Sequence, residues 1–388
     1  MRQSQVLWLI AAGVVLVGVG SWLASRHGAD SGAQPAGQVL PLKQDDLNGV
    51  TRLRIFKGDG SHTTLTRGAT DWVVTERGYP ADTGQVRKLL LDLAALQVEE
   101  RKTADPTLYS KLGVEDPGSA RATGTGLDID SHGKTLKLIV GKTSGTRAVY
   151  VRVAGQAQSL LATPQLAPDA DPRHWLDRSI LDIAPDQITE VDVTPHSGPA
   201  YTIKRSAAGA VPGPKQGAAP GAVSGAAPSA APVYVVSPLP RGRELADAAA
   251  PATQAGALAA LQLDDVRKPG TVAAVAHARF HTHDGLLLDI AGFQDAEQRY
   301  ITVAVSAGTP AAQQRARDLN TRLSGWQFEL PGYRYDTLFR PLEQLLKPKE
   351  AAKPPTGARN PPHSPVPQQS PVPQQSPVPQ HSPVPQSH

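Results

Sequence analysis

Cysteine is absent from the 388 residues of the sequence. A chain without thiols forms no disulfide, binds no metal through thiolates and has no cysteine nucleophile or lipid-modified cysteine. Its stability must therefore come from buried apolar side chains. Hydrophobic residues make up 40% of the chain, which is enough to build the cores of two or three domains at this length.

Net charge is also absent from the central part of the chain, although the pI is about 9.2. Residues 347–388 carry +3 and residues 1–30 carry +1 of the total formal charge of +4, so residues 31–346 sum to zero. Nucleic-acid-binding domains instead gather Lys and Arg on one face. The neutral body predicts that nucleic acid is not a partner.

Complete motifs for phosphate binding or nucleophilic catalysis are missing. Gly133-Lys134-Thr135 and Gly141-Lys142-Thr143 lack the upstream glycine of a phosphate-binding loop. Gly124-Thr125-Gly126 is followed by Ile129 where a dinucleotide fingerprint requires glycine. No G-x-S-x-G nucleophile motif is present. We therefore expect no catalytic residue and no cofactor, and we predict that the protein is not an enzyme.

One pair of histidines has the spacing of metal ligands. His281 and His283 are two residues apart in a predicted strand, so both imidazoles can face one metal ion, with His277 or Asp284 as a further ligand. The favoured interpretation is a hairpin tip with solvated side chains, and a metal-dependent periplasmic enzyme is the weaker alternative. Acid pairs fall in predicted loops or helix ends, where solvation explains them: Asp45-Asp46, Glu99-Glu100 and Asp264-Asp265.

An uncharged run of 19 residues, Val6–Ala24, lies between Arg2 and Arg26. This length suits a transmembrane helix, and tryptophans near both ends suit the membrane interfaces. A cleaved signal peptide is the alternative, but its apolar region is usually shorter and ends in a small-residue site, which is poor or distant here. We predict an uncleaved anchor within residues 1–29. Its assigned residues are Val6, Trp8, Leu16 and Trp22.

The predicted location is the bacterial inner membrane, with a single pass and the body in the periplasm. Arg2 and Arg26 nearly balance each other under the positive-inside rule. The short leader and the long C-terminal body favour an outward-facing body. Residues 30–44 follow as a small-residue linker.

The body is predicted to be α+β, with antiparallel strands and a packed helix in each of two tandem related units. The first unit, residues 45–185, contains a strand at 50–56 and a helix that begins after Asp82, whose capping box includes Gln85. Apolar residues follow at helical spacing and need a sheet to cover. They are Val86, Leu89, Leu90, Leu93 and Leu96.

The second unit, residues 186–346, repeats this layout in degraded form. Residues 255–263 match the leucine-rich helix, and residues 206–232 form an insertion rich in Ala, Gly and Pro that we predict to be disordered. Large apolar residues are expected to be structural in the two units. They are Trp72, Leu89, Leu93, Trp175 and Trp326.

The C-terminal residues 347–388 contain SPVPQ repeats that begin at Ser364, Ser370, Ser376 and Ser382. Such proline density favours polyproline II over a packed fold, and we predict a disordered tail. A cell-wall layer or a proline-recognising protein is a candidate partner. The tail therefore supports an alternative function, a cell-envelope spacer or binding module.

Several short segments carry a family likeness. They are Trp72-Val73-Val74, Tyr79–Asp82, Leu108–Val114, Asp116-Pro117, Leu138–Lys142 and Tyr150-Val151-Arg152. Together they resemble the bacterial family called domain of unknown function 4340. The resemblance implies a membrane-anchored extracytoplasmic protein, similar in setting to auxiliary components of ABC-2-type exporters, including gliding-motility systems, and it supplies no catalytic residues. The expected function is a non-enzymatic periplasmic accessory subunit of a membrane complex, with an ABC permease and ATPase as candidate partners.

Overall fold

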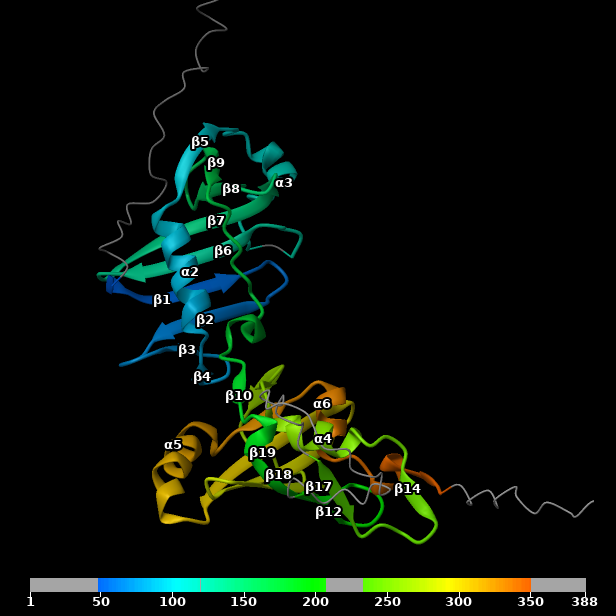
Figure 1. Cartoon of the computed structure of the whole chain (residues 1–388). Helices are drawn as coiled ribbons and strands as arrows, with labels where there is room; N and C mark the ends of the chain where they lie inside the picture. Colours follow the sequence, from blue (N-terminus) through cyan, green and yellow to red (C-terminus); the bar gives the residue numbers. More distant parts are fainter. Residues whose placement is uncertain (1–47, 119, 207–232, 350–388) are drawn as a thin grey trace, which may run out of the picture. The chain divides into compact units, whose positions relative to one another are not determined.

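The computed structural model describes residues 48–118, 120–206 and 233–349. This part of the chain is α+β, with antiparallel sheets and a few helices (Figure 1). The predicted anchor, linker, insertion (apart from Ser206) and nearly all of the tail lie outside the described residues. Within the described ranges, no helix is long and apolar enough to cross a membrane.

The first sheet has nine strands in the order β4-β3-β2-β1-β6-β7-β8-β9-β5, and neighbouring strands run antiparallel. The predicted strand at 50–56 is confirmed as β1, which turns at Gly58–Gly60 into β2. The strands are β1 Val50–Phe56, β2 His62–Arg67, β3 Trp72–Val74, β4 Tyr79–Pro80, β5 Gln97–Arg101, β6 Thr125–Ser131, β7 Lys134–Ser144, β8 Ala148–Val153 and β9 Ser159–Thr163.

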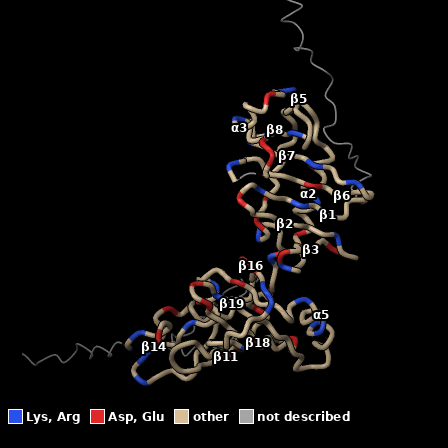
Figure 2. Tube along the Cα trace, turned by 180° about the vertical axis from the view of Figure 1, so that it is seen from behind, with Lys and Arg blue, Asp and Glu red and all other residues tan. Residues whose placement is uncertain are grey.

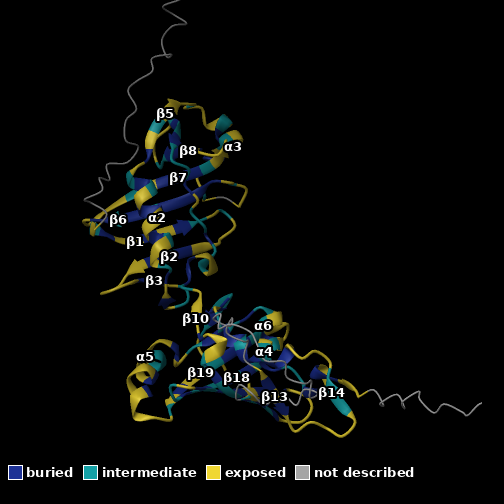
Figure 3. Cartoon of the chain, in the orientation of Figure 1, coloured by how far each residue is buried: buried dark blue, intermediate teal, exposed yellow. Residues whose placement is uncertain are grey.

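Helix α2, Thr83–Ala94, lies across one face of this sheet (Figure 1). Its buried residues are Val86, Leu89, Leu90 and Leu93, and they meet strands whose residues are also buried (Figure 3). The predicted stripe is therefore confirmed for these four residues. Leu96 is fully buried too, but it lies beyond the end of the helix.

The start of α2 differs in detail from a capping box. The Asp82 carboxylate accepts hydrogen bonds from the Gln85 backbone N–H at 3.1 Å and from the Gln85 side chain at 3.2 Å. The Asp82 N–H, which a capping box would satisfy with the side chain at position 85, instead donates to the Trp175 carbonyl at 2.8 Å. The helix start is thus attached to the chain that leaves the sheet.

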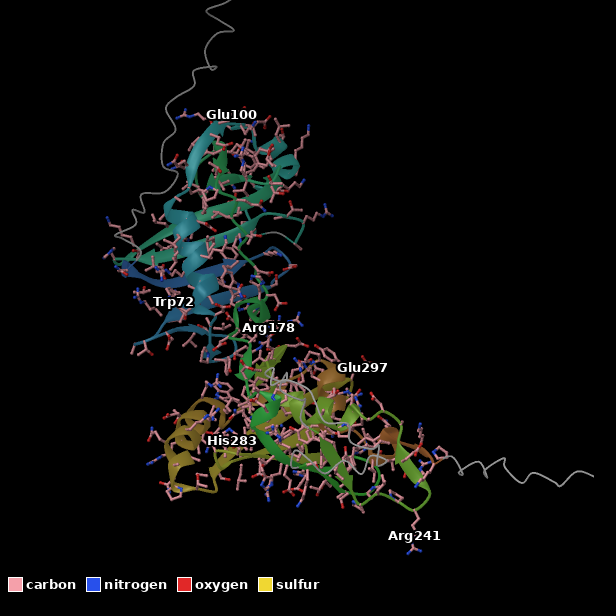
Figure 4. All side chains as sticks on the ribbon, in the orientation of Figure 1. Trp72, Glu100, Arg178, Arg241, His283 and Glu297 are labelled. Atoms are coloured by element: carbon pink, nitrogen blue, oxygen red, sulfur yellow. The ribbon has the colours of Figure 1, made fainter. Side chains whose placement is uncertain are left out.

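Strand β5 was not predicted from the sequence. Glu99 and Glu100 were expected in a loop or at a helix end, but both lie on this exposed edge strand, which pairs with β9 (Figure 4 labels Glu100). Exposed charges on an edge strand disfavour pairing with other chains. This protection explains a strand with almost no apolar residues.

Residues 106–112 form a short helical segment, as the 3₁₀ helix η2, Pro106–Leu108, and the helix α3, Tyr109–Leu112. Gly113 ends it with φ of 70°, a left-handed conformation that favours glycine. The chain that leaves the first sheet contains the 3₁₀ helix η3, Pro172–Trp175. Arg173 pairs with Asp171 at 2.7 Å, and Asp177 accepts a hydrogen bond from the Ser179 N–H.

The second sheet has eight strands in the order β13-β12-β11-β17-β18-β19-β20-β16, again with antiparallel neighbours. Two small sheets pair β10 with β15 and β14 with β21. The strands are β10 Ser179–Leu181, β11 Ile188–Thr194, β12 Tyr201–Arg205, β13 Tyr234–Ser237, β14 Arg243–Leu245, β15 Leu261–Gln262, β16 Asp265–Arg267, β17 Ala276–Thr282, β18 Leu286–Asp295, β19 Gln298–Ala307, β20 Gln327–Glu329 and β21 Leu346–Pro348.

The two large sheets share a strand order. In each, a strand that begins a hairpin (β1 or β11) also pairs with a strand from later in the chain (β6 or β17), and the meander continues from there. A register shift occurs at the same point of both, between Val50 and Arg52 in β1 and between Ile188 and Glu190 in β11. The two sheets therefore correspond in strand order and also in the position of this register shift.

The helices of the second sheet differ from the prediction. The segment 255–263 is not a leucine-rich helix, because helix α4, Ala250–Ala255, ends there and is followed by η5, Gly256–Leu258, and by β15. Small alanines allow a short helix with close packing where the first sheet has long leucines. The remaining elements are η4 Pro185–Gln187, η6 Pro310–Ala312, α5 Gln313–Leu323, α6 Gly332–Leu338 and η7 Leu342–Leu345.

Helix α5 was not predicted from the sequence, and it covers the edge of β19 beyond Tyr300 and Ile301, which pair with β20. Asn320 accepts a hydrogen bond from the Val305 N–H at 2.9 Å, and its amide donates to the Val305 carbonyl. One side chain thus pairs with both backbone groups, as a neighbouring strand would. Ala316, Leu319 and Leu323 repeat at helical spacing, and this was the signal available in the sequence.

We predict that Leu93→Ala will lower the free energy of unfolding by about 3 kcal/mol, because it removes a fully buried side chain from between α2 and the sheet. Leu91→Ala on the same helix is the matched control, since Leu91 is 38% exposed. Its expected cost is below about 1 kcal/mol. Urea unfolding followed by tryptophan fluorescence measures both values, and equal costs would contradict this packing.

Candidate functional site

The predicted structural residues lie mostly in the core. Trp72, Leu89, Leu93 and Trp175 are at most 7% exposed (Figure 4 labels Trp72). Trp326 is only partly buried, and its ring meets Tyr79 edge-on with centroids 5.1 Å apart. Burial raises the pKa of Tyr79 to about 12. Trp326 therefore packs against the core and contacts Tyr79, which is distant in sequence.

The two candidate metal-binding histidines have separate surroundings. His281 Nε2 lies 3.1 Å from Asp192 Oδ2, whereas His283 follows the end of β17 and is exposed (Figure 4 labels His283). Asp284, the expected further ligand, accepts hydrogen bonds from Arg315 and Thr282. Among the described residues, no group of three or more His, Asp or Glu side chains is placed to hold a metal ion.

Of the acid pairs, Asp264-Asp265 lies partly on a strand instead of a loop. Asp265 begins β16 and receives two hydrogen bonds from Arg77, at 2.6 and 2.7 Å. This contact raises the pKa of the Arg77 guanidinium above its ordinary value. Asp264 pairs with Arg178 at 2.7 Å (Figure 4 labels Arg178). Both carboxylates thus connect residues distant in sequence.

One serine and lysine spacing was overlooked in the sequence. Ser131-His132-Gly133-Lys134 has the S-x-x-K spacing of some serine nucleophiles. In the structure it forms the tight turn between β6 and β7, with positive φ at His132 and Gly133. Ser131 is buried and Lys134 is exposed. These four residues therefore form a hairpin turn and do not place the serine beside the lysine as a nucleophile pair.

Four of the six segments that carry the family likeness converge around Arg152, and the segments Trp72-Val73-Val74 and Tyr79–Asp82 lie elsewhere in the first sheet. Its side chain is 4% exposed, Nε donates to the Val114 carbonyl at 2.9 Å, and Nη1 donates to the Gln156 carbonyl at 3.1 Å. Nη2 lies 2.9 Å from Asp116 Oδ1. The guanidinium also stacks 4.6 Å from the Tyr109 ring centroid. Arg152 thus binds β8 to the loop that follows α3.

Lys142 and Gly141 complete this arrangement, which we name the Arg152 cluster (Tyr109, Val114, Asp116, Gly141, Lys142 and Arg152). Lys142 Nζ donates to two carbonyls at the end of α3, both at 3.1 Å. A side chain at Gly141 would collide with the Leu112 carbonyl and with Val114. The glycine and lysine that looked like half of a phosphate loop therefore hold a helix end.

A different set of side chains occupies the face of the first sheet opposite α2. Residues directly opposed across four strands form a row, which we name the first-sheet row: Thr64, Arg54, Asp128 and Lys137. Among the described residues, the side chains of its three charged members form no hydrogen bond or ion pair. Burial raises the pKa of the Asp128 carboxyl above its ordinary value. These side chains border a hollow of about 480 Å³.

The next row of the same face is paired. Asp130 accepts a hydrogen bond from Thr135 at 2.5 Å and forms an ion pair with Arg52 at 2.6 Å. The Thr135 hydroxyl and the Arg52 guanidinium hold the pKa of the Asp130 carboxyl below its ordinary value. Figure 2 shows Lys, Arg, Asp and Glu residues along these strands.

The matching row of the second sheet contains Thr202, Asp192, Arg279 and Asp289. Asp192 accepts from Thr202 at 2.7 Å, and Arg279 pairs with Asp289 at 2.5 Å. Each charged position has the opposite sign to its counterpart in the first-sheet row. In the row of the second sheet, the charged side chains pair with other members of the row. In the first-sheet row, they do not.

These features define an α+β protein of paired antiparallel sheets, with an internal arginine cluster at one end of the first sheet. The sequence profile described as Domain of unknown function (DUF4340) matches residues 72–272, which is more than half of the chain. The chain therefore belongs to the DUF4340 family. Comparisons with curated proteins and with solved structures give no match.

We predict that Arg152→Met will lower the free energy of unfolding by about 3 kcal/mol, because carbonyls and a carboxylate lose a buried charged partner. Arg152→Lys should rescue little, since one ammonium cannot donate in both directions of the guanidinium. Arg147→Met, at an exposed position just before β8, is the control and should cost below about 0.5 kcal/mol. Hydrogen exchange of residues 109–117 should accelerate only in the Arg152 variants, and an unchanged rate would contradict the role of the cluster.

Proposed function

We propose that the protein is a non-enzymatic, single-pass inner-membrane protein whose body lies in the periplasm and serves as an accessory subunit of a membrane complex. Its two sheets are tandem copies of one α+β unit, at residues 45–185 and 186–346. The candidate partners are the permease and ATPase of an ABC exporter. The uncharged run Val6–Ala24 supports the anchor.

The observation that carries this proposal is the charged, open face of each sheet. Helix α2 covers one side of the first sheet, and the opposite side presents Arg, Lys, Asp and Thr residues at fixed cross-strand positions. A subunit that works by contact needs such rigid and polar surfaces. Side chains on strands are held more precisely than side chains on loops.

We predict that the full-length protein, solubilised from its native membrane in mild detergent and captured by a tag placed before residue 347, will co-purify with an ABC permease and ATPase in near-stoichiometric amounts. Mass spectrometry identifies and quantifies the recovered proteins. A variant with the tag but without residues 1–29 is the control and should lose both partners if capture requires the membrane. Recovery of neither subunit by the full-length protein would overturn the accessory-subunit proposal.

The alternative is a cell-envelope spacer or binding module that works through the proline-rich tail. Under the accessory-subunit proposal, deletion of residues 347–388 should leave the recovery of membrane partners within about twofold of the full-length protein. A fall of tenfold or more, or recovery of wall material by the tail alone, would instead favour the spacer.

A further inference from the structure

The first-sheet hollow has the composition of a ligand site. It is bordered by the first-sheet row and by Arg52, Asp130 and Thr135 of the next row. Its volume of about 480 Å³ is within the range of roughly 300–1,000 Å³ that is usual for small-molecule sites. The side chains around it are exclusively polar, and they come from four adjacent strands of a continuous sheet. The positions of the groups are therefore fixed by the backbone of the sheet.

Three cations line the hollow, and two of them are suited to a carboxylate. The third, Arg52, is paired with Asp130. Arg54 has its guanidinium carbon 5.0 Å from the Phe56 ring centroid, and Lys137 lies two strands away and supplies three further donors. Within the part of the chain that the structure describes, neither the Arg54 nor the Lys137 side chain forms an ion pair. Arginine can bind a carboxylate through two parallel charge-assisted hydrogen bonds.

The carboxylate of Asp128 lies between the two cations and adds a second requirement. A bare anion would be repelled by this group, whereas a hydroxyl can donate to it. Thr64 can donate to or accept from a further hydroxyl, whereas the Thr135 hydroxyl, whose hydrogen is donated to Asp130, can only accept from one. The hollow therefore selects a ligand that carries a carboxylate and hydroxyl groups on one rigid frame.

We propose that the first-sheet hollow binds an acidic saccharide, with the sugar carboxylate accepting hydrogen bonds from Arg54 and Lys137 and a neighbouring hydroxyl donating to Asp128. The corresponding row of the second sheet closes its own charges into pairs and offers no such site. This difference between matching positions distinguishes a ligand site from the ordinary charge ladder of an exposed sheet. The ligand extends the proposed function to contact with acidic polysaccharide.

The test is a titration of purified full-length protein in detergent with trigalacturonate, followed by isothermal titration calorimetry. Neutral trigalactose and a triglutamate peptide serve as comparison ligands. We expect trigalacturonate to bind at least tenfold more tightly than either. Arg54→Gln and Lys137→Gln should each weaken its binding by about tenfold, because each removes a charge-assisted hydrogen bond.

Lys204→Gln is the matched control, since Lys204 is an exposed cation on the same kind of face in the second sheet, where it pairs with Glu190. Its effect should be below twofold. Equal weakening by Lys204→Gln would show general charge attraction and overturn the site, and tighter binding of triglutamate would overturn the saccharide assignment. Because no ABC subunit is present, this outcome is independent of the co-purification experiment.

Discussion

The burial of the α2 stripe against the first sheet is the interaction on which the rest of this unit depends. Four side chains of one helix, each worth about 2 kcal/mol when removed from water, pack against the buried residues of these strands. An antiparallel sheet that is covered on one face leaves the other face to solvent. The charged rows are a consequence of this division, because alternate residues of β1 and β6 must point away from the helix.

The spacing of apolar residues along the sequence predicted the main strand and helix of the first sheet. The alternation at 50–56 and the 3.6-residue spacing after Asp82 were sufficient to place β1 and α2, because both elements bury one side. Strand β5 and helix α5 escaped detection because each has few apolar residues. Strand β5 is held by pairing with β9, and helix α5 is held by the contacts of Asn320 with β19. These partners are distant in sequence, so the local residue pattern does not predict them.

The candidate sites show the same limit. The segments around Tyr109, Gly141 and Arg152 were recognised as a family signature, but the sequence did not reveal that they meet at one buried guanidinium. The first-sheet row was not recognised at all. Its members are separated by up to 83 residues, and only the register of four strands brings them together. The histidine pair, which has a clear local spacing, is instead divided between a strand and a turn.

The range matched by the family profile covers part of the first sheet. Residues 72–272 include α2 and the whole Arg152 cluster. The range begins after β1 and β2, which supply Arg54 and Thr64 to the hollow. The strands β6 and β7, which supply Asp128 and Lys137, lie within it. The proposed ligand chemistry depends on the register that joins the first hairpin to these strands, because only this pairing brings Arg54 beside Asp128 and Lys137.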